Sequence, residues 1–522
     1  MAAVVTDQFR ILNAGNFIDS VVDSNNAYYV FLGLDNPTSP AVGFGRTSTW
    51  DTDPPVPTDN LQYRKHYNST SLFGKKITSS NIRRLIRKVQ WTANTAYDMY
   101  RQDYSLANPA PNSNVSRLYD SNYYVINSDY RVYVCISNGS SGTNPKGNKS
   151  QDEPTFTNTD PTAAGTSGDG YLWKYLFSVA PSDIIKFDAT DYVVVPNDWS
   201  TTSETQIQTI REAGNSDLNN NQIKTVYIEN GGLGYSQGTK TLDILGDGTG
   251  GKVSVTVDSS TAITAASIVT GGKGYTWGIV DLAPIQPGGS TLPNAAYLIP
   301  IIPPSKGHGY DIYTELGTDK VLVYGRFDDS TKDFPTDTKF AEVGIIKNPT
   351  SFTSDTVFTE NQYSSLYAAK LSANTATPVI GEEITQIRAD GKTAKAYVGS
   401  YDKDTMVLKY FQDRSLYYDN KFNQTDYKGV SDGAQVYAFE SSTTTSDTIS
   451  FNSGGSGTID STFNDNKITV GNKVTDLGVT FTKGLADPEI NKKTGDIIYI
   501  DNRPLVTRDS RQKEDIKIIL EF

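Results

Sequence analysis

The segment Gly495–Phe522 constrains the fold of this chain most, because two apolar runs flank a polar stretch. The first run consists of three isoleucines, Ile497, Ile498 and Ile500, and ends before Asn502-Arg503-Pro504. The second run consists of four aliphatic residues, Ile516, Ile518, Ile519 and Leu520, and is followed by Phe522. Chain ends usually fray unless another element holds them. The pattern therefore predicts two strands broken by the Asn-Arg-Pro stretch, with the last strand closing a sheet.

The composition favours a β-rich protein. The chain has 522 residues, including 32 tyrosines and 43 glycines, and Ser, Thr and Asn fill the spaces between short apolar runs. Aromatic and β-branched residues suit a pleated, half-buried surface, and glycine suits the turns between strands. The length exceeds what one core supports and suggests about three or four domains. We expect a mainly β fold, with a multi-domain β-sandwich core, one or two helices and two inserted small β-domains.

Charge and cysteine content argue against several classes of protein. The net charge is −12, and an acidic chain repels phosphate backbones, so we expect no nucleic-acid partner. The one cysteine, Cys135, cannot form a disulfide within the chain, which fits a protein made in a reducing cytoplasm. We find no signal peptide and no apolar run of about 18 residues, and therefore expect no membrane anchor.

The strongest helical pattern covers residues 77–91. Four apolar residues recur at helical spacing, at Ile82, Leu85, Ile86 and Val89. Either Ser79 or Ser80 is placed to cap the first turn. Four basic residues share the other side of this predicted helix, Arg83, Arg84, Arg87 and Lys88. This cluster is interpreted as a solvated helix face, as a docking surface for an acidic partner subunit or, least favoured, as a nucleic-acid contact.

A stiff loop is expected at residues 54–57. Three of its residues are prolines, Pro54, Pro55 and Pro57, which fix the backbone and remove hydrogen-bond donors. This loop cannot be a central strand. It is either a contact arm for a partner or a plain connection.

Residues 223–238 and 263–278 are an internal repeat with a period of 40 residues. Each copy is an apolar stretch followed by a Gly-Gly-x-Gly-Tyr turn, and the stretch Val253–Val257 between the copies alternates like a strand. We predict an inserted Gly-rich β-domain at 201–300. A second insertion at 350–494 is predicted to be a small barrel or sandwich. Its expected strands are Glu383–Ile387, Lys395–Tyr401, Thr405–Phe411 and Gln435–Glu440.

The catalytic and cofactor motifs fail when their context is considered. Gly246, Gly248 and Gly251 match a dinucleotide-binding pattern, but a strand follows where that motif requires a helix. Val253 stands where a phosphate-binding loop requires Ser or Thr. The two histidines, His66 and His308, do not make a metal site, and His308 is interpreted as a turn residue. We expect no cofactor, no metal and no enzymatic activity.

Seven segments in collinear order, covering roughly half of the chain, carry a family resemblance. They are VTDQFR (5–10), GRTSTW (45–50) with PPVPTDN (54–60), VYVCISN (132–138), GDGYLWKYLF (168–177), DYVVVP (191–196), FAEVGIIKNP (340–349) and the segment 495–522. Together they resemble the gene-product-eight family of baseplate wedge proteins in T-even-like contractile-tailed bacteriophages. In that family the first segment is a strand. The stretches 201–300 and 350–494 have no counterpart in the shorter family members.

The resemblance implies a baseplate wedge core formed by residues 1–200, 301–349 and 495–522. It implies a virion structural protein of the tail baseplate, made in the cytoplasm of the bacterial host and forming a homodimer. The implied partners are the neighbouring wedge proteins of the gene-product six, seven, ten and fifty-three types. The implied role is mechanical: the subunit holds its neighbours and moves as a rigid body when the baseplate triggers sheath contraction.

Two other functions stay open. The first is a receptor-binding or adhesin-type tail protein that uses the inserted, Tyr-rich β-domains. The second is a tail-associated enzyme that degrades glycans, whose carboxylate pair cannot be found from spacing alone.

Overall fold

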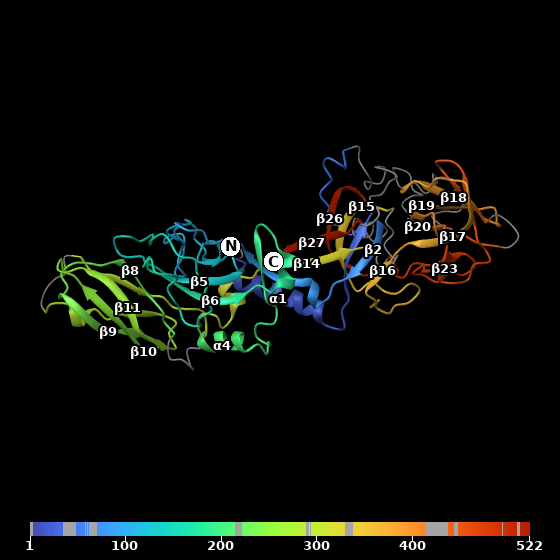
Figure 1. Ribbon diagram of the computed structural model, residues 1–522. Helices are drawn as coiled ribbons and strands as arrows, with labels where there is room; N and C mark the ends of the chain where they lie inside the picture. Colours follow the sequence, from blue (N-terminus) through green and yellow to red (C-terminus); the bar gives the residue numbers. More distant parts are fainter. Residues whose placement is uncertain are drawn as a thin grey trace. The chain divides into compact units, whose positions relative to one another are not determined.

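The computed structural model confirms the mainly β class, with several antiparallel sheets and short helices between them (Figure 1). The structure describes residues 4–34, 49–57, 59, 61, 70–214, 222–288, 292, 294–328, 338–412, 437–442, 447–492, 494–508 and 512–522.

The chain divides into two compact units, here called the first and second unit. The first unit comprises residues 1–16, 83–322 and 519–522, and the second comprises residues 17–82 and 323–518. The chain passes between the units within four elements, which are α1 (Asp7–Val22), β3 (Ile82–Arg87), β14 (Lys320–Phe327) and β27 (Glu514–Glu521). The boundaries of the two inserted domains stay a prediction.

A three-stranded sheet lies in the first unit. Its order is β4 (Tyr124–Ile126), β5 (Arg131–Asn138) and β6 (Tyr171–Ser178). Cys135 of β5 is buried opposite Trp173 of β6, and Tyr171 stacks on Trp173 with ring centroids 5.3 Å apart. Burial of these large rings supplies much of the apolar surface that stabilises this sheet.

A second sheet has the order β27-β14-β3-β7, with β7 at Tyr192–Val195. Apart from α1, the helical elements up to α6 are short. They include η2 (Ser79–Asn81), η3 (Leu118–Asp120), α3 (Pro181–Phe187), α4 (Thr205–Gly214) and α6 (Ile312–Leu316). The C-terminal Phe522 lies beside α1, where Arg10 Nη1 donates to its carbonyl at 3.2 Å.

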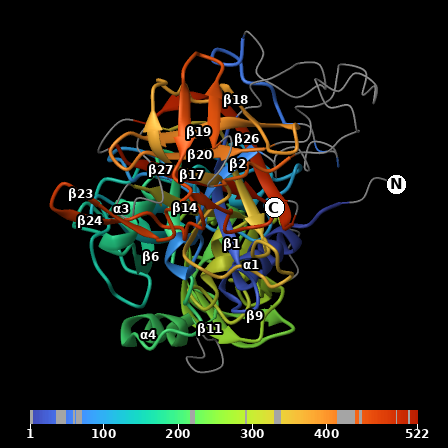
Figure 2. The ribbon, with the colours of Figure 1, turned by 90° about the vertical axis from the view of Figure 1, so that its right-hand side faces the viewer.

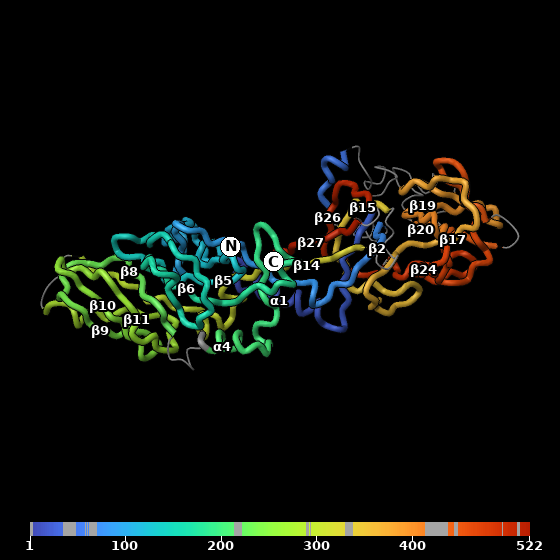
Figure 3. The backbone as a smooth tube through the Cα atoms, viewed as in Figure 1, coloured from blue at the N-terminus to red at the C-terminus, as the bar shows by residue number. Residues whose placement is uncertain are grey.

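The Gly-rich repeat forms a β module with its own core, here called the repeat module (Figure 3). Its main sheet has the order β11 (Ile263–Lys273), β10 (Thr249–Val257), β9 (Gly238–Gly246) and β12 (Gly278–Val280). The short 3-10 helix η4 (Ala283–Ile285) follows β12. The module is entered through β8 (Val226–Asn230) and left through β13 (Tyr297–Pro300), which pair with each other.

The two repeat turns have matching geometry, as their sequence match predicts. Gly232 and Gly272 both have φ of +62°. Tyr235 and Tyr275 are both buried behind their turns. A Cβ at Gly272 would lie 2.6 Å from the backbone nitrogen of Gly251, so this turn requires glycine for space as well as for its left-handed backbone.

In the second unit, a five-stranded sheet has β1 (Tyr28–Gly33) near its centre. Its order is β16 (Gln362–Ser364), β2 (Ser71–Lys76), β1, β15 (Lys339–Lys347) and β26 (Asp496–Thr507). Every residue of β1 is buried, which suits a strand with neighbours on both edges. Lys347 is the register partner of Asp496, so the strands that flank residues 350–494 lie side by side.

Six strands between Tyr367 and Ile459 form a barrel, which is one of the two forms predicted for the second insertion. Six strands close into a ring because β20 pairs with β17 as well as with β19. They are β17 (Tyr367–Asn374), β20 (Val407–Phe411), β19 (Thr393–Asp402), β18 (Glu383–Ile387), β21 (Thr448–Phe451) and β22 (Ser456–Ile459). The short strand β25 (Leu485–Ala486) adds to β17, and β23 (Lys467–Val470) with β24 (Lys473–Asp476) makes a separate hairpin (Figure 2).

The predicted helix at 77–91 is wrong. A capping box between Thr78 and Asn81 forms only the single turn η2, and Ile82–Arg87 continues as strand β3. Leu85 and Ile86 are adjacent and both buried, because the two faces of this sheet are covered. A short apolar run is ambiguous between helix and strand, and pairing with β7 decides in favour of the strand.

Three other expectations of secondary structure are wrong. The first segment of the resemblance is expected as a strand, but α1 begins at Asp7. The Asn502-Arg503-Pro504 stretch does not break its strand, because β26 continues to Thr507 past a register shift opposite Phe340. Proline is tolerated there because β26 is an edge strand. Residues 437–440 are not in a strand, and Gln435 lies outside the described residues.

Candidate interaction site

The basic cluster predicted at 83–88 lies on strand β3 and its continuation, and the structure separates its four members. Arg83 and Arg84 contact neighbouring elements of the first unit, whereas Arg87 and Lys88 line a cleft. A helix would have placed all four on one solvated face. On a strand, successive side chains point to opposite sides, and the cluster is divided.

Arg83 connects β3 to helix α3. Its Nε lies 2.8 Å from Oδ2 of Asp183, and its Nη2 lies 3.0 Å from Oδ1. The guanidinium also lies over the ring of Phe187, 5.2 Å from the centroid. Asp183 stands in the first turn of α3, where the helix dipole favours a negative charge. This bidentate, largely buried pair makes Arg83 a structural brace between strand and helix.

Arg84 contacts helix α6. Its guanidinium carbon lies 4.0 Å from the ring centroid of Tyr313. The Tyr313 hydroxyl donates to the carbonyl of Pro196 at 2.7 Å, which holds the ring in place. Burial raises the pKa of Tyr313 to about 12, so the hydroxyl remains a donor at neutral pH. A Cβ on Gly15 would lie 3.0 Å from Nη2 of Arg84, so α1 also approaches this side chain closely.

Arg87 and Lys88 line a cleft with a volume of about 450 Å³, here called the β3 cleft. Arg87 Nη2 donates to the carbonyl of Ser121 at 2.8 Å, and Lys88 Nζ lies 3.2 Å from Oδ1 of Asp188. The cleft holds four basic residues, Arg87, Lys88, Arg117 and Lys320. It also holds four carboxylates, Asp120, Asp191, Asp319 and Glu521.

Two of the four basic residues of the β3 cleft, Lys320 and Arg117, pair with carboxylates of the cleft. Lys320 Nζ lies 2.9 Å from Asp319 and 3.0 Å from Glu521, and Arg117 lies 3.5 Å from Asp120. Equal numbers of cations and carboxylates do not attract a polyanion such as nucleic acid. A partner surface that carries both signs would match this cleft in charge. Contact with a partner through Arg87 and Lys88 stays a prediction.

The proline loop lies on the edge strand β26. Asn502 Nδ2 donates to the carbonyl of Pro55 at 2.8 Å, and the indole Nε1 of Trp50 donates to the carbonyl of Arg503 at 2.8 Å. Pro54, Pro55 and Pro57 are half-buried, whereas Val56 between them is 86% exposed. The loop is therefore anchored on one side and presents Val56 on the other. Contact with a partner at this loop stays a prediction.

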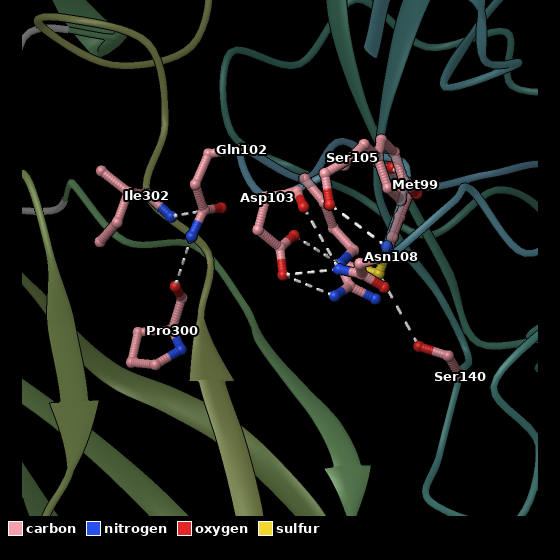
Figure 4. Close-up of polar contacts among 10 residues, drawn as sticks. Met99, Gln102, Asp103, Ser105, Asn108, Ser140, Pro300 and Ile302 are labelled. Atoms are coloured by element: carbon pink, nitrogen blue, oxygen red, sulfur yellow. Dashed lines mark hydrogen bonds and ion pairs between the residues drawn. The ribbon is translucent and has the colours of Figure 1, made fainter. Parts of the chain in front are cut away.

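Sequence reasoning missed a polar junction at the exit of the repeat module (Figure 4). Gln102 Nε2 donates to the carbonyl of Pro300, and its Oε1 accepts from the backbone nitrogen of Ile302, both at 3.2 Å. The adjacent Arg101 is 2% exposed and forms a bidentate pair with Asp103, with distances of 2.9 and 2.7 Å.

The Arg101 guanidinium lies 3.9 Å from the ring centroid of Tyr227 in β8. These contacts tie both connections of the repeat module to residues 101–103. Pro300 and Ile302 are 198 and 200 residues from Gln102 in sequence, and no local pattern reports such contacts.

His308 is more than the turn residue predicted from its Gly-rich surroundings. It is 3% exposed, and its Nδ1 lies 2.7 Å from Oε1 of the buried Glu315. His66 lies outside the described residues. Among the residues that the structure describes, no three His, Cys, Asp or Glu side chains are grouped to hold a metal ion. None of the described helices is long and apolar enough to cross a bilayer.

Comparisons with known proteins give no independent family assignment. No protein-family model matches the chain. No curated protein matches it either.

Proposed function

We propose that this chain is a structural subunit of the baseplate wedge of a contractile phage tail. The observation that supports the proposal most is where the segments with family resemblance lie. VYVCISN and GDGYLWKYLF fall on the paired strands β5 and β6. FAEVGIIKNP falls largely on β15, which pairs with β26 of the C-terminal segment.

A third contact joins one further segment of the resemblance to the C-terminal segment. Trp50 and Arg503 are 453 residues apart in sequence and are hydrogen-bonded to each other. Segments that matter for one shared fold are expected to meet in this way, whereas chance matches scattered along a chain are not. The proposed subunit forms a homodimer, contacts neighbouring wedge proteins, and has a mechanical role. We expect those contacts at the β3 cleft and at the proline loop that exposes Val56.

The proposal is tested with a nonsense mutation in the phage gene that encodes this chain. We expect infected cells to accumulate heads and tail parts without completed baseplates, and a supplied wild-type gene to restore whole particles. Whole, infectious particles that lack the chain would refute the proposal.

A second candidate function, receptor binding, is favoured by an apolar patch on the repeat module. Leu245 on β9 and Ile279 on β12 are register partners, so they share a face, and they are 47% and 54% exposed. Trp277 lies two residues before Ile279 and is 56% exposed. Exposed apolar groups that lie together often mark an interaction surface.

Particles that carry Trp277→Ser and Ile279→Ser separate the two functions. Slower adsorption to cells by fully assembled particles would favour receptor binding. Normal adsorption by these particles would argue against receptor binding and favour the structural role.

A further inference from the structure

A second cavity in the first unit, with a volume of about 520 Å³, is not used by the proposed structural role. Here it is called the tyrosine cavity, because three of its wall residues are Tyr100, Tyr119 and Tyr310. Pro304 and Leu118 add apolar surface, and Gln8 and Ser305 add polar groups. Sites for small molecules are commonly concave, mostly apolar and of about 300–1,000 Å³, with a few placed polar groups.

Tyr100 is the feature that points to a ligand. It is 6% exposed and lines the tyrosine cavity, yet its hydroxyl has no hydrogen-bond partner among the residues that the structure describes. The hydroxyl is not one of the fully buried polar atoms that lack a partner, so it opens into the cavity, where a ligand can reach it. The ring is held edge-on against His308, with centroids 4.8 Å apart.

His308, which packs against the Tyr100 ring, is itself held in place by Glu315. Glu315 accepts from the backbone nitrogen of Gly309 at 2.6 Å through Oε2, while its Oε1 pairs with His308. Burial raises the pKa of Tyr100 well above its usual range, so the hydroxyl stays protonated. A hydroxyl in this state can both donate and accept a hydrogen bond.

The charged groups around the tyrosine cavity argue for a neutral ligand. Both oxygens of Glu315 are occupied, and Asp311 caps α6 by accepting from the backbone nitrogens of Tyr313 and Thr314. The one lysine of the lining, Lys306, lies 3.0 Å from the hydroxyl of Tyr310 and 4.6 Å from the centroid of that ring. A phosphate or other anion would meet one cation and two nearby carboxylates, which is unfavourable.

We propose that the tyrosine cavity binds a neutral saccharide unit. A pyranose ring has an apolar face that can pack on tyrosine and proline rings, and hydroxyls that both donate and accept. The Tyr100 hydroxyl would pair with one of these hydroxyls, and Gln8 and Ser305 at the more exposed end would contact others. This binding does not depend on where in a particle the chain resides.

The test uses the purified full-length chain and saturation-transfer NMR with glucose, galactose, mannose and N-acetylglucosamine as probes. We expect at least one of these sugars to bind with a millimolar or lower Kd. Tyr100→Phe should weaken that binding about tenfold, because it removes one paired hydroxyl and leaves the ring. Tyr310→Ala, which removes a wall of the cavity, should also weaken it.

Two controls make the result specific. Tyr297→Phe removes an exposed hydroxyl of the repeat module and should leave binding unchanged. Lys306→Met should change binding less than Tyr100→Phe does, because the ligand is neutral. Binding by none of the four sugars, or equal binding by the Tyr100→Phe variant, would overturn the proposal.

Discussion

Replacing Arg83 by methionine tests whether the basic cluster braces the fold from within. The pair with Asp183 is charged, bidentate and largely buried, since the two side chains are 18% and 13% exposed. Breaking a fully buried pair costs about 3–5 kcal/mol, and the residual exposure reduces this to about 2–3 kcal/mol. The contact with Phe187 adds about 0.5–1 kcal/mol. We therefore expect Arg83→Met to lower the free energy of unfolding by about 2.5–4 kcal/mol.

A double-mutant cycle with Asp183→Asn isolates the pair. The double variant should be less destabilised than the sum of the single variants, with a coupling energy of about 1–2 kcal/mol. Urea unfolding followed by tryptophan fluorescence is a suitable assay, because Trp91, Trp173, Trp199 and Trp277 all belong to the first unit. A loss below about 0.5 kcal/mol with no coupling would refute the internal brace. It would return Arg83 to the role of a partner contact.

Three further predictions concern pH, a repeat turn and the proline loop. Burial lowers the pKa of Lys174 to about 8. Between about pH 8 and 10 the unfolded state therefore binds more protons than the folded state, and the free energy of unfolding should rise with pH. Lys174→Met should abolish this rise in a pH series of urea titrations. Gly272→Ala should lower the free energy of unfolding by at least about 2 kcal/mol in a urea titration, because the new Cβ would meet backbone atoms. Gly250 has a φ of +77° but open space around it, so Gly250→Ala should cost only about 1 kcal/mol. Equal costs for the two variants would contradict the steric argument. Trp50→Phe, which removes the indole donor to Arg503, should lower stability by about 1–2 kcal/mol in the same assay, and an unchanged midpoint would mean that the loop is not anchored there.

The parts of the fold that local chemistry determines could be predicted from the sequence. Strand β18 covers the predicted residues Glu383–Ile387, and both Gly-Gly-x-Gly-Tyr turns adopt the left-handed backbone that their glycines indicate. The apparent dinucleotide motif is a hairpin between β9 and β10, as the alternation after Gly251 predicts. In each case the deciding interaction lies within a few residues of the pattern.

The errors occur where distant residues decide. Ile82–Arg87 has apolar spacing that fits a helix, but β7, more than 100 residues away, pairs with it as a strand. Arg83 and Asp183 are 100 residues apart, and the Gln102 contacts span about 200. Spacing cannot report such partners. It also could not show that the unpaired hydroxyl of Tyr100 and the loop around His308 meet at one cavity.

The most direct test of the proposed function is a cryo-EM reconstruction of purified, uncontracted tails of the contractile-tailed phage that is proposed to be the source of this chain. The account predicts density for the six-stranded barrel and the Gly-rich repeat module in the baseplate, with neighbouring proteins contacting the β3 cleft or the loop around Val56. Density for this chain only in the head or in fibres outside the baseplate, or its absence from the particle, would contradict the account.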